Sequence, residues 1–133
     1  MIQDFPITGV GMGLFSDVAD NLYPFFLNSP GSVPHAHNLF LQIAVDMGIP
    51  GLITWLSIFF IVIATAWQLY KYGQKRRDSW ASGFGAGLLC SQVALIAHGI
   101  FDAAIWNNAR PAAIIWGIWG LACASWNYYK MRG

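Results

Sequence analysis

The stretch "LITWLSIFFIVIATAWQLY", Leu52 to Tyr70, decides the fold class of this chain. It contains no charged residue and ends directly before Lys71. About 20 apolar residues form a helix long enough to cross the hydrocarbon layer of a membrane, which is roughly 30 Å thick. The composition agrees, because 56% of the 133 residues are hydrophobic and only 10% are charged. We therefore predict an all-α integral membrane protein.

Two further segments have the length and apolar character of membrane spans. They cover about 80–101, "WASGFGAGLLCSQVALIAHGIF", and about 111–129, "PAAIIWGIWGLACASWNYY". Proline is well suited to the first position of a helix, as at Pro111. Gly83 and Gly87 have the small-xxx-small spacing that favours contact with a neighbouring helix over contact with lipid. The sequence thus predicts three transmembrane helices.

The basic residues predict the orientation of these spans. Four lie between the first and second spans and two follow the third: Lys71, Lys75, Arg76, Arg77, Lys130 and Arg132. The positive-inside rule makes both regions cytoplasmic, so that residues 1–51 and 102–110 face outward. Tryptophans near the predicted span ends fit membrane interfaces, namely Trp55, Trp80, Trp106 and Trp126. The net charge of +1 gives no reason to expect a nucleic acid partner.

Residues 1–37 are predicted to form an outer loop. Its "GVGMG" run follows no strand and precedes no Lys-Ser/Thr pair, so it indicates turns rather than a phosphate-binding loop. A short helix is expected from Ser16, and Pro24 would end it.

The segment "PHAHNLFLQIAVDMGIPGL", Pro34 to Leu52, predicts a short amphipathic helix over about 38–47. Gln42 and Asp46 form its polar face, opposite an apolar face of Leu39, Phe40, Ile43, Ala44 and Met47. This helix is too short to span a membrane, so we expect it at the interface. Gly48 and Gly51 would let the chain reverse into the first span, and residues 38–133 would form one membrane region.

Polar residues next to this helix are candidates for chemistry. The imidazole of His37 can accept a proton near neutral pH, and Asn38 can orient it or hold a substrate oxygen. The alternative is an N-cap at Asn38, with His35 and His37 in water. A zinc site is the weaker interpretation, because no third ligand follows at helix spacing. We predict no metal.

Further polar residues lie at the outward end of the second span and in the loop after it. His98 and Asp102 are four residues apart and would share one helical face. They can bind or orient a substrate, or form an interhelical hydrogen bond. Arg110 can contact a lipid phosphate or a substrate diphosphate.

Several motifs together resemble a known family. "DFPITGVGMGLF", "PHAHNLFLQIAVDMGIPGL", "AHGIFD" and "RPAAIIWGIWGL", in this order, resemble the carboxy-terminal third of the O-antigen ligase and polymerase family of bacterial membrane glycosyltransferases. Members of that family have about ten to twelve spans, more than this chain can supply at about 20 residues per span. The resemblance therefore implies a fragment of a larger protein, which alone would be inactive.

The resemblance also implies a function. The family transfers a glycan from an undecaprenyl diphosphate carrier to an acceptor hydroxyl of a glycan or of the lipid A-core, without a metal or other cofactor. The histidine of its His-Asn motif, which matches His37, activates the acceptor. Substrate contacts are expected from the nearby polar residues, namely His35, Asn38, His98, Asp102 and Arg110. The expected location is the bacterial inner membrane, among membrane lipids and the remaining amino-terminal spans.

Two other functions are compatible with the sequence. One is a solute transporter of a bicarbonate-like substrate, because a polar cavity between helices would suit that task. The other is a non-catalytic remnant that inserts into the membrane.

Overall fold

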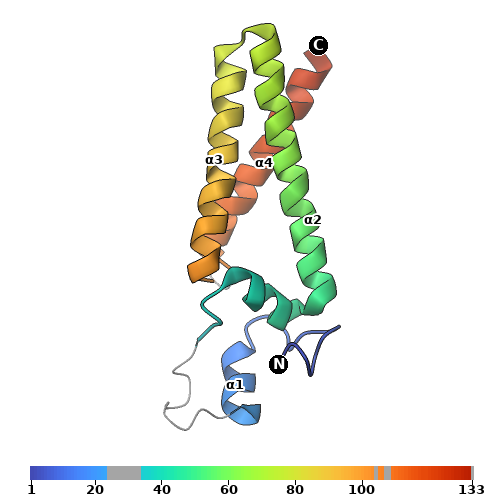
Figure 1. The fold of residues 1–133 in the computed structure, drawn as a ribbon, viewed down its shortest axis with the longest axis vertical. Coiled ribbons are helices and arrows are strands. Elements are labelled where there is room, and N and C mark those ends of the chain that lie inside the picture. Colours follow the sequence, from blue (N-terminus) through green and yellow to red (C-terminus); the bar gives the residue numbers. More distant parts are fainter. Residues whose placement is uncertain (24–33, 104, 107–108, 133) are drawn as a thin grey trace. The chain divides into compact units, whose positions relative to one another are not determined.

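The computed structural model describes residues 1–23, 34–103, 105–106 and 109–132. The described residues form four helices and no strand (Figure 1). These are α1 (Phe15–Leu22), α2 (Leu39–Arg76), α3 (Ser79–Phe101) and α4 (Ala109–Arg132). The chain divides into two compact units, one of residues 1–55 with 98–112 and one of residues 56–97 with 113–133. The all-α prediction is confirmed for the described part of the chain.

Two of the described helices, α2 and α3, are long and apolar enough to cross a membrane. They contain the predicted spans 52–70 and 80–101. The predicted span 111–129 lies within α4, which is helical but is not one of these two. Large apolar side chains are exposed on the helices, including Phe60, Ile61 and Val93. Such surfaces are typical of a membrane protein.

Helix α2 is interrupted at Gly48, whose φ of 71° and ψ of 179° are not helical. Its first part begins at Leu39, in agreement with the helix predicted over 38–47, and the chain changes direction at the break (Figure 1). The break frees backbone groups. Pro50 has no N–H, so the carbonyl of Asp46 cannot receive the usual helical hydrogen bond from the residue four positions later.

The amino-terminal segment satisfies these freed groups. The N–H of Val10 donates to the Val45 carbonyl at 2.8 Å, and the N–H of Gly11 donates to the Asp46 carbonyl at 3.0 Å. The N–H of Ile49 donates to the Pro6 carbonyl at 2.8 Å. Buried backbone groups need partners, so residues 6–11 and the break at Gly48 depend on each other.

Glycines make this contact sterically possible. A Cβ built on Gly9 would lie 2.4 Å from the Asp46 carbonyl oxygen, and one built on Gly48 would lie 2.3 Å from the Ile7 carbonyl oxygen. Gly9, Gly11 and Gly13 all have positive φ. The turn interpretation of "GVGMG" is confirmed. The short helix predicted from Ser16 is α1, and Pro24 lies outside the described residues.

The prediction that Gln42 and Asp46 form an exposed polar face of the helix over 38–47 is wrong. Gln42 and Asp46 are 0% and 1% exposed, whereas Leu41 is 51% exposed. The physical reason is that the amide and the carboxylate are hydrogen-bonded inside the protein, as described below. Two of the predicted interfacial tryptophans also have internal contacts. Trp55 is buried, with its ring 6.0 Å from that of Phe40 between centroids, and Trp106 is hydrogen-bonded to Asp46.

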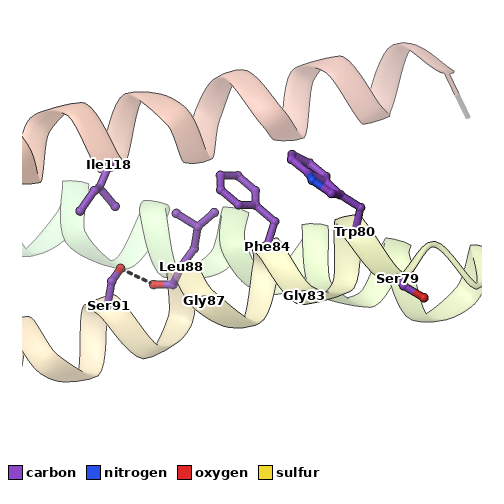
Figure 2. Close-up of a pocket in the computed structure, with 8 residues that line it drawn as sticks. All are labelled: Ser79, Trp80, Gly83, Phe84, Gly87, Leu88, Ser91 and Ile118. Carbon is purple, nitrogen blue, oxygen red and sulfur yellow. Dashed lines mark hydrogen bonds between the residues drawn. The ribbon is translucent and has the colours of Figure 1, made fainter.

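In the unit of residues 56–97 and 113–133, glycines other than the predicted pair bring helices together. A Cβ on Gly73 would lie 2.2 Å from the Ser82 nitrogen, and one on Gly85 would lie 2.6 Å from the Tyr70 nitrogen. Nothing described lies within 4 Å of a Cβ built on Gly83 or Gly87. The predicted close contact of this pair is therefore wrong within this chain. Both glycines line an open concavity with Ser79, Trp80, Phe84, Leu88, Ser91 and Ile118 (Figure 2).

Candidate active site

His35 and His37 lie on a tight turn just before α2. The φ of His37 is 48°, in the left-handed region that residues other than glycine rarely adopt. In this conformation the backbone N–H of His37 donates to Nδ1 of His35 at 3.2 Å, and the two ring centroids are 4.3 Å apart. This backbone conformation and its hydrogen bond thus place the two imidazoles next to each other.

The structure brings Asp102 to the two histidines. Nε2 of His35 lies 3.7 Å from Oδ1 of Asp102, and the same oxygen accepts the N–H of Ala103 at 2.7 Å. Because Nδ1 of His35 accepts a hydrogen bond, the proton of the neutral ring is on Nε2, facing the carboxylate. One nitrogen or oxygen atom from each of His35, His37 and Asp102 lies within 4.8 Å of the others. We call these three residues the histidine cluster.

Asn38 has the structural role that the N-cap alternative predicted. Its Oδ1 accepts the N–H of Leu41 at 3.0 Å, which caps α2. Its Nδ2 donates to the carbonyl of Ile100 at 3.0 Å. Asn38 therefore also connects the turn that carries His35 and His37, the histidine turn, to the end of α3, two residues before Asp102.

The remaining predicted site residues, His98 and Arg110, are not members of the histidine cluster. His98 is exposed on α3, and its contact with Asp102 is a backbone one, from the Asp102 N–H to the His98 carbonyl at 3.0 Å. Arg110 lies in the first turn of α4, and its side chain is outside the described part of the structure.

A partly buried polar network, which was not predicted from the sequence, adjoins the cluster through the backbone of Ala36. The N–H of Ala36, between the two histidines, donates to Oε1 of Gln42 at 2.7 Å. Nε2 of Gln42 donates to Oδ1 of Asp46 at 2.9 Å, and the indole N–H of Trp106 donates to Oδ2 of Asp46 at 2.9 Å. The only sequence signal was a polar pair, Gln42 and Asp46, at i and i+4.

Burial governs the electrostatics of this network. Asp46 lies before the break in α2, outside the predicted span 52–70. Burial raises the pKa of Asp46, and the hydrogen bonds from Gln42 and Trp106 offset part of this rise because they favour the ionised carboxylate.

The histidine cluster offers the three donors that a metal ion would need, and Asp102 is the third ligand that the sequence did not reveal. The hydrogen bonding argues against a metal in this arrangement. Nδ1 of His35 accepts a backbone N–H, so the neutral ring carries its proton on Nε2 and has no free lone pair. The arrangement is better suited to proton transfer than to metal binding.

One comparison with known proteins gives a match. Residues 1–56 match the model of a family described as O-Antigen ligase. No curated protein and no solved structure matches the chain. The matched segment contains the amino-terminal turns, the histidine turn and the break at Gly48, while Asp102 and Trp106 lie beyond it. This match supports the family prediction over residues 1–56.

Proposed function

We propose, from the premise that residues 1–56 belong to the O-antigen ligase family, that this protein transfers a glycan from an undecaprenyl diphosphate carrier to an acceptor hydroxyl. The observation that carries the proposal is the histidine cluster, in which an exposed His37 lies beside a His35–Asp102 pair. Polysaccharide biosynthesis is the process that such a reaction serves, and the acceptor is a glycan or the lipid A-core.

His37 is the residue of the cluster with a ring available for proton transfer. Nδ1 of His35 accepts a backbone N–H and its Nε2 faces Asp102, so both of its nitrogens are engaged. The side chain of His37 is exposed. A neutral imidazole is a suitable general base near neutral pH. We therefore assign the base to His37.

In the proposed step the acceptor oxygen attacks the anomeric carbon, and its proton moves to His37. A new carbon–oxygen bond forms while the bond from that carbon to the diphosphate breaks, and the electron pair leaves with the diphosphate. Asp102 stabilises the positive charge that develops on His37, because oppositely charged groups a few ångströms apart attract each other. The diphosphate needs cationic donors, for which Arg110 stays a prediction. A role for His98 in binding the acceptor also stays a prediction.

We further propose that α4 is a third span and that the protein lies in the bacterial inner membrane. The basic residues at the end of α2 and directly after it, Lys71, Lys75, Arg76 and Arg77, support a cytoplasmic location for this end of the helix. The histidine cluster would then lie on the outer side, within a larger protein whose other spans bind the diphosphate.

His37→Ala in the full-length protein tests the function. We expect transfer of lipid-linked glycan in isolated membranes to fall by about 10²-fold or more, since the general base is removed. Asn127→Ala, which removes an exposed polar side chain from α4, is the matched control and should retain activity. Unchanged transfer by His37→Ala, at equal membrane insertion, would contradict the proposal.

A further inference from the structure

A single, partly buried chain of hydrogen bonds joins the two segments that carry the histidine cluster. At one end is Ala36, between His35 and His37, and at the other is Trp106, four residues after Asp102. Gln42 and Asp46 connect the two ends through contacts of 2.7, 2.9 and 2.9 Å. The histidine turn and the Asp102 segment are thus fixed to the same two side chains of α2.

The chemistry of this chain leaves little freedom. The N–H of Ala36 fixes the orientation of the Gln42 amide, which must then present its NH₂ group to Asp46. Trp106 offers only an N–H donor. Both carboxylate oxygens of Asp46 therefore accept hydrogen bonds. An amide at position 46 would instead point one of its N–H groups at another N–H donor, which is unfavourable.

Two further hydrogen bonds link Trp106 to Asp102 through the backbone of Ala103. The backbone N–H of Trp106 donates to the Ala103 carbonyl at 2.9 Å, and the N–H of Ala103 donates to Oδ1 of Asp102 at 2.7 Å. Ala103 itself is 1% exposed. A displacement of the indole would therefore move the carboxylate that faces His35.

We propose that Gln42, Asp46 and Trp106 are positioning residues that hold Asp102 against His35 and His37. Their effect on glycan transfer rests on the proposed function. They do not touch the reacting atoms, and they act by keeping the carboxylate within reach of the imidazoles. A displacement of about 1 Å from a productive geometry can cost up to about 10²-fold in rate.

Trp106→Phe tests whether Trp106 acts through Asp102, because it removes the indole N–H and keeps an aromatic ring. We expect the maximal transfer rate to fall about tenfold with little change in KM for the glycan donor. In the background of Asp102→Asn, the same substitution should cause no further loss. An equal additional loss in that background would overturn the proposal, because Trp106 would then act independently of Asp102.

Asp46→Asn tests the hydrogen-bond logic. The asparagine amide can accept from Gln42, but its NH₂ group would face the indole N–H. We expect the double variant Asp46→Asn, Trp106→Phe to be more active than Asp46→Asn alone, since it removes the conflicting donor. Losses that multiply in the double variant would contradict the network as described.

A labelling measurement separates this proposal from the proposed function. In an Ala103→Cys variant, Trp106→Phe should raise the labelling rate by a membrane-impermeant maleimide about tenfold, by freeing the segment that buries position 103. Equal labelling rates with and without the indole N–H would overturn the positioning role. Full transfer activity in His37→Ala would instead overturn the assigned base and leave the labelling result valid.

Discussion

Gly9 and Gly48 lie backbone against backbone: a Cβ on Gly9 would be 2.6 Å from the Gly48 nitrogen. This contact lets residues 6–11 supply the hydrogen bonds that α2 loses at its break. Two segments that the sequence analysis considered separately, "DFPITGVG" and "VDMGIPG", are therefore in direct contact.

Gly48→Ala should destabilise the protein. Its φ of 71° is unfavourable for any side chain, and the new Cβ would collide with the Ile7 carbonyl oxygen at 2.3 Å. We expect a loss of at least about 2 kcal/mol in the free energy of unfolding, seen as a lower thermal midpoint in detergent. Gly87→Ala is the matched control, since no atom of the described residues lies within 4 Å of a Cβ built there. Equal thermal midpoints for both variants would contradict the close contact between Gly48 and residues 6–11.

Asn38 can be tested through its two hydrogen bonds. Asn38→Asp keeps an acceptor for the Leu41 N–H but loses the donor to the Ile100 carbonyl. Asn38→Ala loses both and should cost about 1 kcal/mol more, the usual value of an N-cap. Thermal unfolding of both variants checks this order. If the aspartate variant were as unstable as the alanine variant, the cap would contribute nothing.

Asp102→Asn should lower the rate of transfer. The amide oxygen can still accept the Ala103 N–H, but the negative charge near the imidazoles is lost. The positive charge that develops on His37 during transfer is then less well stabilised. At neutral pH we expect about a tenfold lower rate, because the base itself remains. A rate equal to that of the wild type would show that the carboxylate has no electrostatic role.

The contact between α2 and α3 can be tested at Gly85. Gly85→Ala would place a Cβ 2.6 Å from the Tyr70 nitrogen, so the helices must separate. We expect a loss of about 1–3 kcal/mol from overpacking, measured by unfolding in detergent. Gly83→Ala is the control two residues away, because its Cβ would have no neighbour within 4 Å among the residues that the structure describes. Similar losses for both variants would contradict the observed packing.

Local signals in the sequence were enough to predict several elements. The apolar runs gave the spans contained in α2 and α3, and periodicity with Gly48 gave the short helix and its end. These features depend on residues close in sequence.

Partners distant in sequence could not be predicted in this way. Helical periodicity shows that Gln42 and Asp46 share a face but cannot show that Trp106, 60 residues after Asp46, will cover it. Asp102 was paired with His98 by an i, i+4 rule, but α3 ends at Phe101 and Asp102 turns toward His35 instead. A carboxylate on a short amphipathic helix is expected to be exposed, whereas Asp46 is buried.

The network around Asp46 constrains how homologous proteins can be recombined. A chimera joined after residue 56 would inherit Asp46 from one parent and Trp106 from the other, so the crossover would divide an acceptor from its donor. If the two homologues have different residue pairs at positions 46 and 106, the chimera would lose this hydrogen bond. It would then insert normally into the membrane but misplace the carboxylate at position 102. In natural lineages the two positions are expected to change together.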